Sequence, residues 1–163
     1  MIIGHLPAGY LLTRLLYPPT VFPWRIFILS GLCGALAPDL DMLYFHLIDH
    51  GQTHHHRYFT HFPAFWGGLL LLALFAWLLT RFARAGLLAS VFAGNGMVHL
   101  CLDSIVGDIW WLAPFVDRPF SLFTVPALYQ PWWLNFLLHW SFGLELGLVV
   151  WAVFVWQRGR DSR

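Results

Sequence analysis

The sequence predicts an all-α fold, a polytopic membrane helix bundle of about five helices that forms a single domain over residues 1–163. Two observations carry this prediction. The chain is 59% hydrophobic and only 10% charged, whereas soluble domains carry about 25% charged residues. Five of its segments are also apolar over lengths close to the roughly 20 residues that cross a bilayer. This composition excludes a soluble globular protein and a disordered one.

The first two segments are the less regular ones. Residues 2–17 form a short apolar run with Pro7 in its first turns, where a helix tolerates proline. Residues 21–37 are apolar after Pro23 and Arg25. We expect this helix to end before Pro38, because proline disfavours helical geometry in the preceding residue, here Ala37.

The other three segments are long enough to span a membrane. Residues 62–80 are apolar throughout, residues 85–106 contain His99 and Asp103, and residues 132–156 contain His139 and Glu145. Ionisable side chains inside spanning helices are costly and mark functional sites. We therefore expect these four polar residues to have a function.

Arginine predicts the orientation of the bundle. Seven arginines fall at one set of helix ends and only two, Arg57 and Arg118, at the other. Basic residues favour the cytoplasmic side. We therefore expect the N-terminus outside and the C-terminus inside a bacterial inner membrane. The cytoplasmic set is Arg14, Arg25, Arg81, Arg84, Arg158, Arg160 and Arg163.

Histidine and aspartate gather at the opposite, periplasmic end of the predicted helices. His99 and Asp103 are four residues apart and share a helix face, which suits two ligands of one metal. An isolated pair of this kind is more often a hydrogen-bonded polar pair, but burying an unpaired aspartate in an apolar span is costly. Asp39 and Asp41 follow a helix end, where they are either a polar terminus or metal ligands.

The densest polar stretch precedes the third predicted span. His55, His56 and His61 are candidate metal ligands there, and His54 adjoins them. Arg57 lies among them, and its guanidinium can bind phosphate through two hydrogen bonds. We expect a catalytic role for Arg57 towards an anionic substrate, although an anchor in the lipid headgroups is an equal alternative.

Glu145 and the remaining histidines are the other candidate site residues. Glu145 lies about ten residues into its span, so it is protonated, paired or metal-bound, and we expect it to act as a base. His5 completes the predicted ligand set near the N-terminus. Whether the site also includes further histidines is left open: His46, His50, His54 and His139.

The order of these motifs resembles the LexA-regulated, inner-membrane-associated proteins classed as metal-dependent hydrolases, the YdjM-like family. The motifs are His5, Pro38-Asp39-Leu40-Asp41, His56-Arg57-Tyr58-Phe59-Thr60-His61 and His99-Leu100-Cys101-Leu102-Asp103. The chain departs from the family where it has His-His-Arg-Tyr in place of Gly-His-Arg-Gly. The spacing of Asp41, His55, His99 and Asp103 is also faintly similar to zinc-dependent phospholipase C. The family resemblance implies a metal site more firmly than a substrate.

The residues and the resemblance together predict a metal-dependent hydrolase, an enzyme that binds one or more divalent ions, zinc above all. We expect it to cleave a phosphoester of a membrane lipid or lipid-linked substrate. The alternative is a non-catalytic membrane protein that binds or moves metal ions. We expect no nucleic-acid partner, and the oligomeric state is open.

Overall fold

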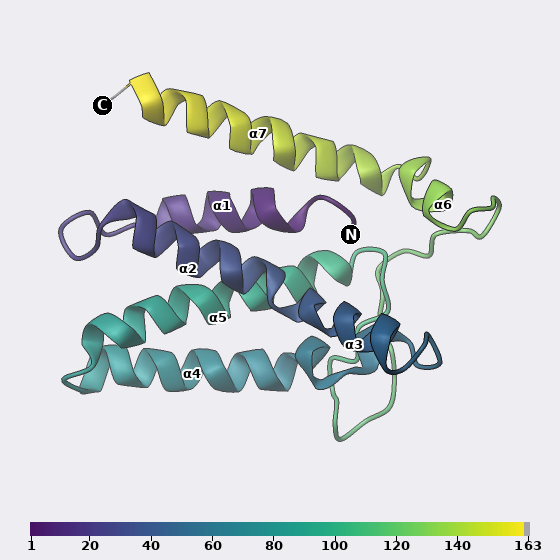
Figure 1. Cartoon of the computed structure of the whole chain (residues 1–163), viewed down its shortest axis with the longest axis horizontal. Helices are drawn as coiled ribbons and strands as arrows, with labels where there is room; N and C mark the ends of the chain where they lie inside the picture. The colour runs from purple at the N-terminus through teal and green to yellow at the C-terminus, as the bar shows by residue number, and fades with distance from the viewer. Residues whose placement is uncertain (162–163) are drawn as a thin grey trace.

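The computed structural model describes residues 1–161, and their regular structure is helical (Figure 1). An isolated β-bridge joins Ile109 and Phe120. The all-α prediction is therefore confirmed. The α-helices are α1 (His5–Leu16), α2 (Trp24–Leu36), α3 (Asp41–Leu47), α4 (Pro63–Leu79), α5 (Ala83–Asp103), α6 (Trp133–Leu137) and α7 (Ser141–Asp161). Three 3-10 turns are η1 (Pro38–Leu40), η2 (His55–Arg57) and η3 (Phe59–His61).

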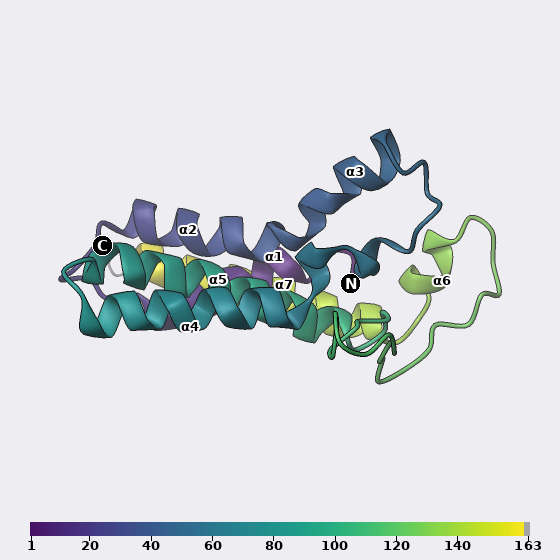
Figure 2. The same cartoon turned by 90° about the horizontal axis from the view of Figure 1, so that it is seen from below.

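Helix α5 is the centre of the bundle. It packs against α4, α2 and α1, and α7 lies along the outer side of α1 (Figures 1 and 2). Small residues allow these close approaches. A Cβ atom on Gly34 would lie 2.1 Å from the carbonyl oxygen of Phe92, and one on Gly96 would lie 2.2 Å from the ring of Trp66. Small residues at helix contacts are typical of helices that associate in membranes.

The second helix bends where the sequence predicted that it would end. Helix α2 and the segment Pro38–Leu47 meet at 57°, and α3 leaves the bundle (Figure 2). Ala37 nevertheless keeps helical dihedral angles, φ −60° and ψ −35°. The expectation that Pro38 would force Ala37 out of helical geometry is therefore wrong. Helix α2 does end at Leu36, before Pro38, as expected, because proline lacks an N–H group and its ring excludes the carbonyl four residues earlier.

The structure supports fewer spanning helices than the five predicted. Within residues 1–161, α5 has the length and apolar composition to cross a membrane. The bent pair formed by α2 and Pro38–Leu47 makes a second candidate, while α4 is apolar but has 17 residues. The predicted span over residues 132–156 is divided into α6 and α7. A bundle of five spanning helices is thus not confirmed.

The outward faces of α4 and α7 expose large apolar side chains. Leu71 of α4 is 70% exposed and Val150 of α7 is 69% exposed. Exposed apolar patches of this kind mark surfaces that contact protein or lipid. The core lies on the other side of α4, where Trp66 packs with Ala93 and Leu100 of α5.

Candidate metal centre

The predicted polar residues meet at one end of the bundle. Different elements supply them: His5 begins α1, Asp39 lies in η1, His61 ends η3, and His99 and Asp103 lie in the last turns of α5. We call the whole group the His/Asp cluster. Its members are His5, Asp39, His55, His56, His61, His99 and Asp103.

Three residues of the cluster, Asp39, His61 and His99, place ligand atoms within 4.8 Å of one another, and Asp103 adjoins both histidines. The Nε2 atom of His99 lies 3.0 Å from Asp103 Oδ2 and 3.4 Å from Asp39 Oδ1. The Nε2 atom of His61 lies 3.8 Å from Asp39 Oδ1 and 3.9 Å from Asp103 Oδ2. Tetrahedral zinc with bonds of about 2.0–2.1 Å separates its ligand atoms by about 3.3 Å. We call Asp39, His61, His99 and Asp103 the four-ligand set.

Hydrogen bonds fix which nitrogen of each histidine faces the cluster. The Nδ1–H group of His61 donates to Asp41 Oδ2 at 2.6 Å, and that of His99 donates to the Ala35 carbonyl at 2.7 Å. This carbonyl belongs to the last turn of α2, where carbonyls lack partners within the helix. The Nε2 lone pairs therefore point inward, in the tautomer that binds metals.

The inward-facing atoms are buried without hydrogen bonds. Among the described residues, His61 Nε2, His99 Nε2 and Asp103 Oδ2 are each buried with no such partner. Unpartnered buried polar atoms are rare and need an explanation such as an ion. Neutral imidazoles and carboxylates are donors that zinc and similar divalent metals accept. The four-ligand set could therefore hold a metal ion.

His55 and His56 extend the cluster from η2. Their ligand atoms and that of His61 lie within 4.8 Å of one another, and His56 Nε2 is 3.9 Å from Asp103 Oδ2. Burial lowers the pKa of His55 to about 4 and the pKa of His56 to about 2. Both rings are therefore neutral at pH 7, which metal binding requires.

His5 approaches the cluster from α1. Its Nε2 atom lies 3.2 Å from Asp103 Oδ1, and its ring stacks on His99 with 3.7 Å between centroids. The amino group of Met1 contacts the same oxygen of Asp103. His5, His99 and Asp103 thus form another donor group. Because His99 has one free nitrogen, it can serve only one ion at a time.

Asp41 lies next to the cluster, on the Nδ1 side of His61. Its Oδ2 atom accepts hydrogen bonds from His61 Nδ1 at 2.6 Å and from the Thr60 hydroxyl at 2.6 Å. Helix α3 begins at Asp41, and the bend at Pro38 turns this carboxylate towards η3. Asp41 is therefore placed to orient His61. Its other oxygen, Oδ1, is buried without a hydrogen bond, so its role as a metal ligand stays a prediction.

Glu145 has a structural role that the sequence did not reveal. Its Oε2 atom accepts hydrogen bonds from the backbone N–H groups of Ile2, Ile3 and Gly4 at 2.8, 2.6 and 2.9 Å. Glu145 is 2% exposed and reaches these groups from α7. It thereby joins α7 to the segment that leads into α1, and its role as a base stays a prediction.

Arg57 contacts residues outside the cluster. Its guanidinium donates to Asp117 Oδ2 at 2.8 Å and lies over the Trp110 ring, 5.5 Å from the centroid. The Trp110 Nε1–H group donates to the other oxygen of Asp117 at 2.6 Å. These contacts connect η2 to residues 107–131. A role of Arg57 in binding phosphate stays a prediction.

The histidines left open by the sequence separate into different environments. His54 lines the pocket described next, and His46 is exposed on α3. His50 has a positive φ of 51° in the turn after α3. His139 Nδ1 contacts the Ser141 hydroxyl at 2.9 Å, at the break between α6 and α7.

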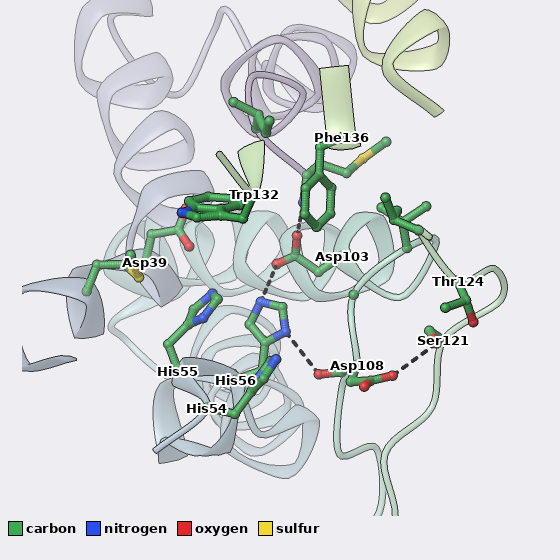
Figure 3. A pocket seen from close by; sticks show the side chains of 16 residues that line it. Asp39, His54, His55, His56, Asp103, Asp108, Ser121, Thr124, Trp132 and Phe136 are labelled. Carbon is green, nitrogen blue, oxygen red and sulfur yellow. Dashed lines mark hydrogen bonds and ion pairs between the residues drawn. The ribbon is translucent and has the colours of Figure 1, made fainter. Parts of the chain in front are cut away.

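A pocket of about 650 Å³ opens beside the cluster (Figure 3), a size typical of small-molecule sites. The polar wall includes Asp39, His54, His55, His56, Asp103 and Asp108. The apolar wall includes Ile2, Met42, Val106, Val125, Trp132 and Phe136. An amphiphilic molecule could therefore place a polar group at the cluster and an apolar group against the second wall.

Asp108 is a site residue that the sequence reasoning missed. Its carbonyl accepts a hydrogen bond from His56 Nδ1 at 2.9 Å, and its side chain lines the pocket. Its position in the sequence could have indicated this role, because Asp108 closely follows the helix that carries His99 and Asp103. Trp132 also lines the pocket.

The fold and the site define a class: a helical, membrane-associated protein with a candidate metal centre at one end. The chain belongs to the YdjM inner membrane protein family, whose model matches residues 1–160. The predicted family resemblance is thereby confirmed. No curated protein and no solved structure matches the chain. The similarity to zinc-dependent phospholipase C stays a prediction.

Proposed function

We propose that this protein is a metal-dependent hydrolase, and that it cleaves a phosphoester of a lipid or lipid-linked substrate at the periplasmic face of the inner membrane. The observation that carries the proposal is the position of the four-ligand set beside an amphiphilic pocket. Both Asp39 and Asp103 line this pocket, so a bound molecule reaches the candidate metal ligands directly.

Zinc is the ion that the donors favour, because imidazole nitrogens and carboxylate oxygens are its usual ligands. Asp39, His61, His99 and Asp103 would hold it. Bound zinc would supply Lewis-acid catalysis by polarising a phosphoryl oxygen.

The residues of the chain would bind the substrate and control access of water. The Asp39 side chain is 39% exposed, whereas those of His61 and His99 are fully buried, so substrate and water approach from the Asp39 side. Hydrolysis breaks the bond between phosphorus and the leaving alcohol oxygen, and the oxygen of one water bonds to phosphorus. One proton of that water goes to the alcohol.

The arrangement of arginines supports the proposed orientation. Arg14 and Arg158 lie in the last turns of α1 and α7, Arg25 and Arg84 in the first turns of α2 and α5, and Arg81 between α4 and α5. These helix termini lie at the end of the bundle opposite the His/Asp cluster (Figure 1). Arg163 lies outside the described residues. We infer a multi-pass protein with these arginines in the cytoplasm.

The packing beneath the cluster bears on the alternative of metal transport. A Cβ atom on Gly9 would lie 2.5 Å from Ala35 Cβ, and one on Gly31 would lie 1.9 Å from Thr13 Oγ1. Helices α1, α2 and α5 are therefore tightly packed between the cluster and the arginine end. This favours a site that is open on one side over a pathway for ions. Metal binding without catalysis is the remaining alternative.

Two measurements on the detergent-purified full chain test the proposal. Elemental analysis should find bound zinc in the wild type and much less in His99→Ala, with His46→Ala as a matched control on exposed α3. Zinc-loaded wild type should release product from a panel of phospholipids and polyprenyl phosphates. Bound zinc without turnover of any lipid would favour the non-catalytic alternative, and wild type that binds no divalent metal would refute both.

A further inference from the structure

The charges that line the pocket bear on which lipid it accepts. Within the described part of the chain, the pocket wall carries the carboxylates of Asp39, Asp103 and Asp108 but no guanidinium. The chain contains no lysine, and Arg57, the arginine next to the cluster, binds Asp117 instead. The fixed positive charge at the pocket is the Met1 ammonium group, which contacts Asp103.

A divalent ion and the Met1 ammonium group would together balance the three carboxylates. The ion would lie beside Asp39 and Asp103 in the four-ligand set, and the Met1 ammonium group contacts Asp103. The phosphodiester of a lipid and the carboxylate of Asp108 would then both be negative in the same pocket. A positively charged group on the substrate would relieve this repulsion, whereas a second negative group would increase it.

The wall that carries Asp108 is held by backbone hydrogen bonds. Ile109 and Phe120 exchange two of them, at 3.0 and 2.9 Å, directly after Asp108 and before Ser121. The Ser121 hydroxyl donates to Asp108 Oδ1 at 3.0 Å. A further bond, from Leu122 N–H to the Ser104 carbonyl at 2.8 Å, attaches this wall to the end of α5. The carboxylate is therefore fixed relative to the cluster.

The two ends of the pocket differ in polarity. Figure 3 shows Asp108 on one side of Asp103 and the rings of Trp132 and Phe136 on the other. These rings meet at 85° with 5.9 Å between centroids, which makes an apolar corner. A lipid phosphate beside Asp103 would thus place its headgroup towards Asp108 and its acyl chains towards Trp132 and Phe136.

We propose that the pocket selects phospholipids whose headgroup carries an amine, that Asp108 binds this ammonium group, and that anionic headgroups are disfavoured. The proposal rests on the lipid hydrolase function proposed above, whose substrate class it narrows. Asp108 is a specificity-determining residue in this arrangement. Because its side chain is exposed to water, we expect a preference of about fivefold, the upper value for exposed ion pairs.

The test compares lipids with identical acyl chains. Zinc-loaded full-length protein in nanodiscs should cleave phosphatidylethanolamine about fivefold faster than phosphatidylglycerol. Asp108→Asn should bring this ratio close to one, and Asp108→Arg should invert it. Asp49→Asn is the matched control, because Asp49 lies outside the pocket and binds Thr53; it should keep the wild-type ratio. Zinc content and thermal unfolding would show that the Asp108 variants fold.

A binding measurement separates this proposal from the hydrolase proposal. Short-chain versions of the two lipids are titrated against tryptophan fluorescence, to which Trp132 in the pocket contributes, and the same fivefold ratio should appear in their dissociation constants. Selective binding without cleavage would refute the hydrolase function but support the selection. Equal affinities, or tighter binding of phosphatidylglycerol, would overturn the selection even if lipids are cleaved.

Discussion

The carboxylate of Asp41 accepts a hydrogen bond from Nδ1 of His61 at 2.6 Å, on the side of the ring opposite the free Nε2 atom. Asp41 is 6% exposed and His61 is fully buried. A carboxylate in this position fixes the tautomer and orientation of a metal-binding histidine and raises its basicity. Asp41 and His61 therefore form one hydrogen-bonded unit, and we expect His61 rather than Asp41 to contact an ion.

Asp41→Asn should weaken metal binding about 10-fold to 100-fold, the usual effect of losing such a partner. The amount of zinc bound at saturation should not change, because Asp41 would not be a ligand. Competition with a chelating dye measures both quantities in detergent. Asp49→Asn removes a carboxylate from the loop after α3 and should leave the affinity unchanged. A loss of bound zinc at saturation would restore Asp41 to the ligand set.

Removing a direct ligand should reduce zinc binding more than Asp41→Asn does. His99→Ala and Asp103→Ala should abolish most zinc binding, because their donor atoms lie 3.0 Å apart at the centre of the four-ligand set. Zinc at 100 times its dissociation constant should stabilise the wild type by about 2.7 kcal/mol, and these variants should lose that gain. Thermal unfolding with zinc and with a chelator measures the difference. An equal zinc-dependent shift in His99→Ala would remove His99 from the set.

The sequence predicted the convergence of the cluster because its signals are local. The four-residue spacing of His99 and Asp103 requires only a helix, and ionisable residues in an apolar segment already require partners. The family resemblance supplied the order of the motifs. None of these signals depends on how the helices pack.

The directions of several side chains depend on tertiary contacts, and the sequence could not predict them. Asp39 and Asp41 are two residues apart, but the bend at Pro38 places one at the pocket and the other behind His61. Glu145 reaches the backbone of residues 2–4, which lies more than 140 residues away in the chain. Asp117, the partner of Arg57, lies 60 residues from it. Long-range partners of this kind have no local sequence signal.

Glu145 gives a stability prediction. Glu145→Ala leaves three backbone N–H groups without their acceptor and should lower the free energy of unfolding by about 3 kcal/mol. Glu145→Gln keeps an oxygen acceptor and should lose less. Thermal unfolding in detergent measures both effects, with zinc content as the control for the metal centre. If Glu145 were instead the catalytic base, Glu145→Gln would abolish hydrolysis without changing stability.

The orientation of the chain can be tested directly. Reporter fusions within residues 107–131 should report a periplasmic location, and fusions at the C-terminal end should report a cytoplasmic one, because five arginines of the described helix termini lie opposite the cluster. The two fusion points lie before and after α7, so each result checks the location that the other reports. A periplasmic C-terminus would place the His/Asp cluster on the cytoplasmic face.

The contact between Arg57 and Asp117 distinguishes two roles for Arg57. Their side chains are 48% and 69% exposed, so the pair should contribute at most about 1 kcal/mol to stability. If its role is to hold residues 107–131 against η2, Arg57→Ala and Asp117→Ala should each slow hydrolysis about fivefold, and the double variant should be no slower, because coupled residues are not additive. We expect this result, together with unchanged zinc binding in all three variants. High salt should slow hydrolysis by the wild type towards the rate of the variants, because salt screens the ion pair.

If Arg57 instead binds the substrate phosphate, Asp117→Ala would free Arg57 and keep or raise the rate of hydrolysis. Arg57→Lys would then lose most activity, because lysine lacks the planar pair of donors.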